Sequence, residues 1–458
     1  MAIDRSRLPE VGPDPSFTFP AIVHHTLPNG LRVRVVEHRS VPVITFVLQL
    51  DGGSAADSAG REGLAALVAD MVDEGTGSLS AIDVSDAMSR LGAEYDVDVG
   101  PDSTTFTLTT LTRFADRGAS LLASLVTTPS LRESDFDRVR QLRLDRLRQL
   151  KDLAPAVAER AFLRLMYDTH PYGHLAIGSE HSLPQLQLGD VVAMHRERYA
   201  PSGATLVVTG AMDAADLIAV AERAFAAWQS DTSAVGPGGG PVPDPTGPAQ
   251  APRLAIVPRE GAAQSELRIG HLSARRDTPD YPALLVMNAL LGGQFVSRVN
   301  LKLREEKGYT YGARTGFDWH RGLSPFSLQA SVHTAATADA IRDSLAELEA
   351  IRGSRPPTRE ELALAKASLT RGYPRNFETA QQVARGVAQL ALYDLPDSYF
   401  AEFIPKANGV SESELVSAAA RYLDPSRLTT LIVGDHAAIA ESLANLNIGT
   451  PEVLPVPV

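Results

Sequence analysis

The chain has 458 residues, a formal net charge of −12 and no cysteine. Its length suits two or three domains, and 44% hydrophobic with 21% charged residues is typical of a globular protein with full apolar cores. The acidic balance argues against a nucleic-acid ligand and is compatible with a basic peptide or protein partner, and the lack of cysteine excludes disulfides, thiolate catalysis and cysteine-bound zinc.

Charged residues interrupt the first thirty positions, which therefore lack the apolar core of a signal peptide. No apolar run approaches the ~20 residues that a membrane-spanning helix needs. The sequence thus predicts no membrane span and a cytoplasmic location by default, with the periplasm as the alternative if a leader has been removed.

The pattern of residues predicts a mixture of strands and helices. Residues 43–50 and 104–111 are rich in β-branched and aromatic residues, which favours strands. Helices are predicted at residues 114–126, 134–151, 153–168 and 335–352. Because strands do not alternate strictly with helices, we expect an α+β fold with mainly antiparallel sheets.

One segment is predicted to be a linker. In residues 236–252, GPGGGPVPDPTGPAQAP, 11 of 17 residues are Gly or Pro, a composition that excludes a helix or a central strand. The segment divides the chain into an N-terminal domain, residues 1–235, and a C-terminal domain, residues 253–458.

The two parts share a repeated unit. Residues 198–210, RYAPSGATLVVTG, match residues 421–434, RYLDPSRLTTLIVG, and each follows an amphipathic helical stretch, at 188–197 and 412–420. In both copies Pro-Ser turns the chain into a β-rich run. A helix–turn–strand unit that occurs once per half indicates duplication of a whole domain.

Residues 63–76, GLAALVADMVDEGT, form one amphipathic helix by their pattern. They also resemble the motif helix of insulinase/pitrilysin metallopeptidases, through Gly63, Leu64, Ala65, Met71, Gly75 and Thr76. The inverted zinc motif of that family, H-x-x-E-H, would place zinc-binding histidines at 66 and 70 and the water-activating glutamate at 69. This chain has Ala66, Ala69 and Asp70, and two methyl groups can neither bind zinc nor accept a proton.

The family's third zinc ligand is a glutamate some 75 residues further along, where the nearest acidic residue here is Asp145. Glu159 lies too far along the chain. His170 and His174 lie four residues apart in HPYGH, but Pro171 and Gly173 predict a turn that does not align two imidazoles. We therefore predict no metal site in this chain.

A second resemblance to the same family lies in residues 290–317, LLGGQFVSRVNLKLREEKGYTYGARTGF. Its G-G-x-F-x-S-R-L…L-R-E-x-x-G-x-x-Y segment is matched by Gly292, Gly293, Phe295, Ser297, Arg298, Leu303, Arg304, Glu305, Gly308 and Tyr311. In two-subunit bacterial members one subunit carries zinc and the other an arginine–tyrosine pair, whose positions Arg304 and Tyr311 occupy.

The resemblance implies that Arg304 holds a backbone carbonyl of the substrate and that Tyr311 donates a hydrogen bond to the tetrahedral oxyanion. Tyr309 is the rival for the hydroxyl role. By pattern alone, residues 304–307 would instead be a solvated helix end capped by Gly308, and both tyrosines a strand face.

The resemblance covers almost the whole chain, from residues 28–37 to the final IVG strand. It implies two α+β halves facing each other across a cavity. It also implies a non-catalytic partner subunit that pairs with a homologous zinc-bearing chain, completes its site and contacts a peptide or unfolded protein. The alternatives are a scaffolding member with no need of Arg304 or Tyr311, and a stand-alone peptide-binding protein.

Overall fold

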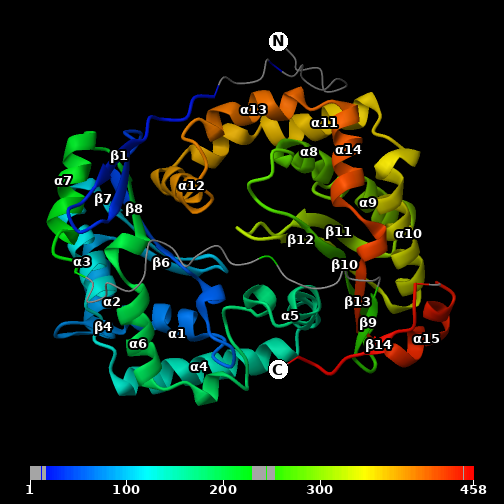
Figure 1. Ribbon diagram of the computed structural model, residues 1–458, viewed down its shortest axis with the longest axis horizontal. Helices are drawn as coiled ribbons and strands as arrows, with labels where there is room; N and C mark the ends of the chain where they lie inside the picture. Colours follow the sequence, from blue (N-terminus) through cyan, green and yellow to red (C-terminus); the bar gives the residue numbers. More distant parts are fainter. Residues whose placement is uncertain (1–11, 13–16, 230–243, 245–252, 447, 458) are drawn as a thin grey trace, which may run out of the picture.

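Two sheets organise the molecule (Figure 1), for which the computed structural model describes residues 12, 17–229, 244, 253–446 and 448–457. The strand order of the first sheet is β1 (Val23–Thr26), β2 (Arg32–Glu37), β8 (Ala204–Gly210), β3 (Val43–Asp51), β7 (Ser103–Leu111) and β6 (Glu94–Val99). Within it only β2 and β8 are parallel. The strands predicted at 43–50 and 104–111 are thus confirmed, and the structure shows that they are neighbours.

The second sheet repeats the order of five of these strands. It consists of β11 (Thr310–Phe317), β12 (Ser324–His333), β10 (Gln264–Ala274), β13 (Thr429–Gly434), β9 (Arg253–Pro258) and β14 (Glu452–Val453). Strand β9 is parallel to β13 and β14, and the other pairs are antiparallel. Read from β6 and from β11, the first five strands of the two sheets have the same pattern of connections. The sixth strands differ, because β1 precedes β2 and is antiparallel to it, whereas β14 follows β13 and is parallel to β9. The two sheets confirm the α+β, mainly antiparallel prediction.

The repeated helix–turn–strand unit occupies the same place in both halves. Helix α6 (Leu188–Arg198) leads through a 3₁₀ turn into β8, and α14 (Glu412–Tyr422) leads through a similar turn into β13. The remaining long helices are α2 (Ala81–Leu91), α3 (Ala115–Thr127), α4 (Glu133–Lys151), α5 (Ala154–Tyr167), α7 (Ala214–Phe225), α8 (Tyr281–Leu291), α10 (Thr337–Glu349), α11 (Arg359–Thr370), α12 (Ala380–Leu392), α13 (Tyr399–Gly409) and α15 (His436–Ala444). The predicted linker, residues 236–252, lies outside the described residues except for Asp244.

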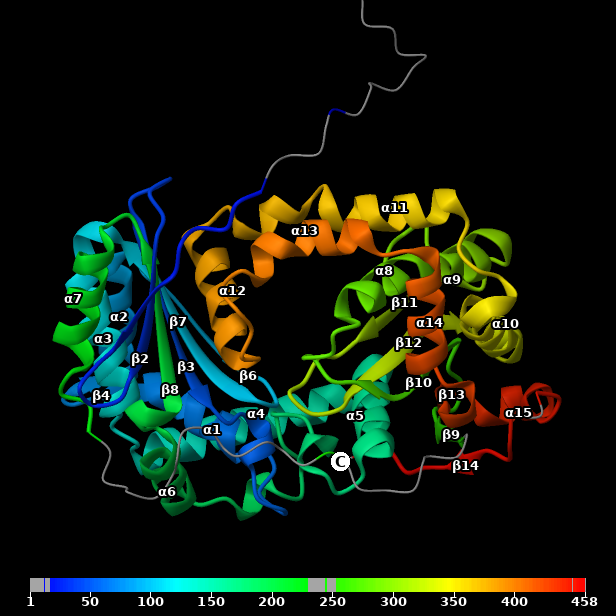
Figure 2. The ribbon, with the colours of Figure 1, turned by 45° about the horizontal axis from the view of Figure 1, so that its top comes forward.

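Each half gives one helix to the other (Figure 2). Helix α5 packs on β10 and β13 of the second sheet, and α12 packs on β3 and β8 of the first. Phe162 shares an apolar cluster with Leu431, and Val387 shares one with Val47. Both sheets therefore bury apolar side chains against the other half.

Polar contacts also join the halves, at the loop between β11 and β12. The Arg321 guanidinium contacts Asp51 at 3.0 Å, and its backbone N–H donates to Asp102 at 2.9 Å. The same carboxyl group accepts a hydrogen bond from the hydroxyl of Tyr172. The hydroxyl of Tyr167 donates to the carbonyl of Leu323 at 2.6 Å. Because these groups are largely buried and mutually satisfied, they fix the relative position of the two sheets.

Candidate functional site

The helix with the altered zinc motif, α1 (Leu64–Met71), is shorter than predicted. Residues 72–74 continue as a 3₁₀ turn, and Gly75, at φ 147°, starts a short strand. The helix begins after Gly63, at φ 95°, where a Cβ atom would lie 2.7 Å from the Cα of Gly178. Glycine is thus required at this position by both the positive φ and the close approach.

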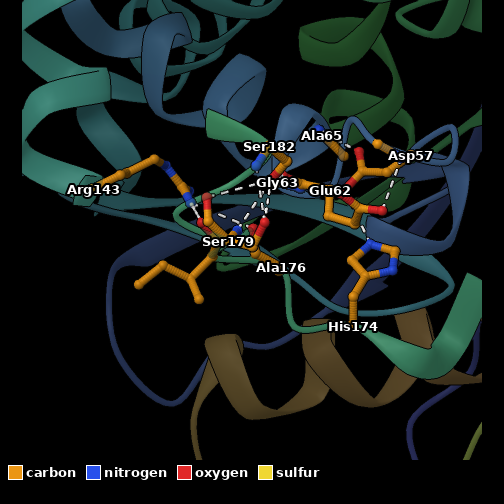
Figure 3. Close-up of polar contacts among 11 residues, drawn as sticks. Asp57, Glu62, Gly63, Ala65, Arg143, His174, Ala176, Ser179 and Ser182 are labelled. Atoms are coloured by element: carbon orange, nitrogen blue, oxygen red, sulfur yellow. Dashed lines mark hydrogen bonds and ion pairs between the residues drawn. The ribbon is translucent and has the colours of Figure 1, made fainter. Parts of the chain in front are cut away.

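A buried carboxylate anchors the start of α1 (Figure 3). Asp57 accepts hydrogen bonds from the backbone N–H groups of Gly63 and Ala65, both at 2.7 Å. The Nε2 atom of His174 lies 3.2 Å from the same carboxylate. These contacts satisfy N–H groups that have no partner inside the helix. His174 thus supports α1, while His170 packs against Tyr167 and Tyr172, so the two histidines point to different partners.

The zinc-motif positions hold no set of metal ligands. Ala66 is 3% exposed and Ala69 is fully buried in the apolar core. The Oδ2 atom of Asp70 lies 2.7 Å from the Nε atom of Arg143 on α4. Arg143 also donates to the carbonyls of residues 176 and 177 (Figure 3). An arginine therefore already supplies the positive charge beside the only acidic group at these positions. Asp145, near the third ligand position, pairs with Arg148 at 2.7 Å.

Within the described ranges, no three His, Asp or Glu side chains are grouped closely enough to hold a metal ion. A zinc ion needs three or four nitrogen, sulfur or carboxylate ligands in one place. The residues at 66, 69 and 70 do not fit that requirement, and no chemical step at α1 can be assigned to a metal.

A cavity of about 650 Å³ nevertheless opens beside α1, between β6 and α4. Its charged lining residues are Asp70, Asp73, Glu74, Asp96, Arg143 and Arg146. Burial, followed by the neighbouring Glu74, raises the pKa of Asp73 to about 6. Carboxylates thus predominate in this cavity, which we call the acidic cavity.

A second cavity, of about 510 Å³, contains both Arg304 and Tyr311, and we call it the arginine cavity. Arg304 lies on a π-helical turn, Leu301–Glu306, that continues the short helix α9 (Arg298–Asn300). A π-turn changes the direction of side chains along a helix and is frequent at functional sites. The Cζ atom of Arg304 lies 3.9 Å from the centre of the Phe295 ring, so the guanidinium makes a cation–π contact with this ring.

Tyr311 projects from a bulge in the edge strand β11. The pairing with β12 shifts between Thr310 and Ala313. At this bulge the side-chain hydroxyl of Thr310 donates a hydrogen bond to the backbone carbonyl of Ser331 on β12, at 2.6 Å. Tyr311 is 89% exposed as a result. Tyr309 instead packs against the core of the second half. The structure therefore brings Tyr311, and not Tyr309, into one cavity with Arg304.

Other residues of this motif hold the α8–α9 loop and β11 in position around Arg304 and Tyr311. A Cβ atom at Gly292 would lie 2.5 Å from the hydroxyl of Thr315, so glycine is needed where the α8–α9 loop meets β11. The Asn300 side chain accepts a hydrogen bond from the N–H of Ala313 at 2.8 Å. Buried Arg298 binds both carboxyl oxygens of Glu361, at 2.8 and 2.7 Å, and this holds the pKa of Glu361 below its usual range.

Sequence reasoning missed a polar row on the floor of the arginine cavity. Arg314, Gln329 and Arg268 are cross-strand partners on β11, β12 and β10, and Ser331 and Glu266 form the adjacent pair. Polar residues at every second position of 264–268 and 327–331 are the signal that could have found them. All five of these side chains line the cavity.

Two family models match the chain on either side of residue 180. Residues 32–179 match the insulinase model (peptidase family M16), and residues 185–369 match the peptidase M16 inactive domain. The chain belongs to the insulinase family. Its motif helix lacks the histidines and glutamate of the zinc motif, which makes it a non-catalytic member of that family.

Three relatives extend this likeness. A Mycobacterium tuberculosis protein named an uncharacterized zinc protease is 24% identical over 90% of this chain and 93% of its own length. A zinc protease of Helicobacter pylori is 23% identical over 89% and 91%. A probable mitochondrial-processing peptidase subunit beta of Schizosaccharomyces pombe is 23% identical over 58% of both chains.

Solved structures show the same fold. A peptidase M16 inactive domain from Pseudomonas fluorescens superimposes with a TM-score of 0.84 at 23% identity, covering 90% of this chain and 98% of that one. A protease from Helicobacter pylori gives a TM-score of 0.83 at 21% identity, covering 91% and 100%. In the part of the chain that the structure describes, no helix is long and apolar enough to cross a bilayer.

Proposed function

We propose that this chain is the zinc-free partner subunit of a two-subunit zinc peptidase. One observation carries the proposal: Arg304 and Tyr311 converge on a single cavity, while Ala66, Ala69 and the Asp70–Arg143 pair stand where a zinc site would be. The chain thus has the groups that hold a peptide and stabilise an oxyanion, but not those that activate water.

The environment of the two side chains suits these roles. Arg304 is one-third exposed and rests on Phe295, so its terminal nitrogens face the cavity and can donate to a peptide carbonyl. Tyr311 is a neutral donor that can be aimed at a developing negative charge. Its hydroxyl becomes an effective donor only when a second surface excludes water from it, because 89% of the residue is exposed in the single chain.

The partner would carry the zinc. A homologous chain with an intact H-x-x-E-H motif supplies the metal-activated water, and this chain contributes Arg304 and Tyr311 to the composite site. Phe295 lines the arginine cavity and is 63% exposed, and Val296 and Leu301, close to it in the chain, are 44% and 46% exposed. These apolar side chains offer a surface for contact with a partner.

The test is co-expression with a homologous chain that carries an intact H-x-x-E-H motif, sought first in the coding sequence adjacent to that of this protein. We expect one size-exclusion peak at the summed mass, with peptidase activity that a chelator removes. Two chains that elute separately at micromolar concentration, and that show no gain of activity on mixing, would refute the partner-subunit role.

A second candidate function is a stand-alone peptide-binding protein. It is favoured by the two cavities within one chain and by the internal exchange of α5 and α12, which covers β3 and β8 of the first sheet and β10 and β13 of the second. The two functions differ in one measurable respect. A stand-alone binder holds peptides tightly without any second chain, whereas a partner subunit gains most of its affinity in the complex.

Substitution of Arg304 separates both functions from a purely scaffolding role. Arg304→Ala should raise KM in the complex and weaken peptide binding, and Arg304→Lys should restore only part of the loss because an ammonium lacks the planar fork of donors. Steady-state kinetics on both variants measures this. Wild-type values for Arg304→Ala would favour the scaffold.

A further inference from the structure

The arginine cavity has the opposite charge to the protein as a whole. Its charged lining residues are Arg268, Arg304, Arg314 and Glu266, whereas the whole chain carries a net charge of −12. A local excess of arginine in an acidic protein attracts anionic groups to that place and repels cationic ones.

The single carboxylate of the cavity is already engaged. Glu266 is 6% exposed and Arg268 is 4% exposed, and they form an ion pair at 2.5 Å. The second carboxyl oxygen of Glu266 accepts a hydrogen bond from Ser331. This buried pair is neutral as a unit, so it cannot compensate the charge of the other two arginines.

Arg304 and Arg314 are held mainly by neutral groups. Arg304 rests on the Phe295 ring, and among the residues that the structure describes its only carboxylate neighbour within 4 Å is Glu305, 3.4 Å from Nε. Arg314 donates from Nε and Nη2 to the Oε1 atom of Gln329, at 3.2 and 2.9 Å. Gln329 is itself oriented by Ser327 at 3.2 Å, so its oxygen is turned toward Arg314.

The Phe295 ring and the Gln329 amide hold the two guanidinium groups in place without neutralising their charge. Arg314 also lies on β11, three residues beyond Tyr311 and on the strand that carries it. A peptide that reaches Arg304 and Tyr311 therefore passes within the same cavity as Arg314. A carboxylate is the peptide group that two-pronged guanidinium donors bind best.

We propose that the arginine cavity selects peptides that present a carboxylate, and that Arg314 is the residue that determines this specificity. The proposal rests on the peptide-binding role proposed above and narrows it to a substrate class. The carboxylate can come from an Asp or Glu side chain or from the C-terminus of the peptide. The acidic cavity across the molecule repels the same group, which gives the bound peptide a direction.

The test is direct binding to the full-length chain, measured by fluorescence anisotropy with dye-labelled peptides. The first set places one Glu at each position of an amidated polyalanine hexapeptide, with Gln at the same position as the control. The second set compares the free acid with the amide of a peptide that lacks Glu. We expect one register of the Glu peptide, or the free acid, to bind about 10-fold more tightly than its neutral counterpart.

Arg314→Gln should abolish this preference, so that acidic and neutral peptides bind with about equal affinity. The matched control is Arg223→Gln, which makes the same charge change on an exposed residue of α7 paired with Asp116. It should keep the preference. Because Arg314 is exposed, its variant should keep the wild-type circular dichroism and melting temperature.

The outcomes separate this proposal from the proposed function. Equal binding of neutral and acidic peptides, with binding still lost in Arg304→Ala, would refute the carboxylate preference and leave the peptide-binding role intact. A preference that survives in Arg314→Gln would refute the assignment to Arg314. No binding of any peptide, either alone or with the zinc-bearing chain, would overturn both.

Discussion

Replacement of Tyr311 by Phe removes one oxygen atom from the most exposed large side chain beside Arg304. The hydroxyl makes no hydrogen bond within the described residues, and 89% of the residue is exposed. The free energy of unfolding should therefore change by less than about 0.5 kcal/mol. A loss of activity in this variant cannot then be attributed to loss of the fold.

In the complex with the zinc-bearing chain, Tyr311→Phe should lower kcat and leave KM nearly unchanged, because the oxyanion exists only in the transition state. Loss of one such donor in other hydrolases costs about 100- to 1000-fold, or roughly 3–4 kcal/mol. Steady-state kinetics with a quenched fluorescent peptide measures both constants.

Tyr309→Phe is the matched control, since it removes the same atom two residues away from a ring that packs on the core. It should be nearly silent. Wild-type turnover in Tyr311→Phe with loss of turnover in Tyr309→Phe would show that the wrong tyrosine has been assigned. Two silent variants would show that the cavity has no catalytic part and would favour the scaffold.

Three further predictions concern metal, stability and pH. The isolated chain, dialysed and analysed for metal, should hold no stoichiometric zinc and cleave no peptide, and one tight zinc with chelator-sensitive turnover would overturn the assignment. Arg298→Ala should lower the free energy of unfolding in urea by about 3–5 kcal/mol, because it leaves the Glu361 carboxylate without its bidentate partner, and a change below 1 kcal/mol would contradict this. Burial raises the pKa of Asp73 from 3.8 to about 6, so its contribution to stability is lost as pH rises through that range. Asp73→Asn should thus be more stable than wild type by up to about 3 kcal/mol above pH 6, with the gap closing toward pH 4, and a gap independent of pH would refute the shift.

Local patterns determined much of the candidate site. Arg304 and Tyr311 are only seven residues apart, and the glycines and asparagine that shape their loop lie in the same short segment. The loss of the zinc motif was equally readable, because H-x-x-E-H occupies consecutive helix positions. The end of α1 was harder to predict from the sequence. The helix stops at a 3₁₀ turn, and Gly75 after it pairs with a short neighbouring strand, which the helical period of the sequence does not indicate.

Only the structure distinguishes the surroundings of Tyr309 and Tyr311. Both tyrosines fit the same strand pattern, and only the bulge at Thr310, fixed by a hydrogen bond to Ser331 on the neighbouring strand, turns Tyr311 outward. The HPYGH segment likewise gained its role only in three dimensions, where His174 reaches the Asp57 carboxylate, 117 residues away along the chain.

By itself the sequence determined the family, the two similar halves, the missing zinc ligands and the arginine–tyrosine pair, because each depends on residues close together in the chain or on a repeated segment. Only the tertiary structure decided that α5 and α12 are exchanged between the sheets and that Arg143 neutralises Asp70. It also decided that Arg314, Gln329 and Arg268 form one row. These features depend on strand register and on helix packing between distant segments, which are set by the burial of whole faces and not by any local pattern.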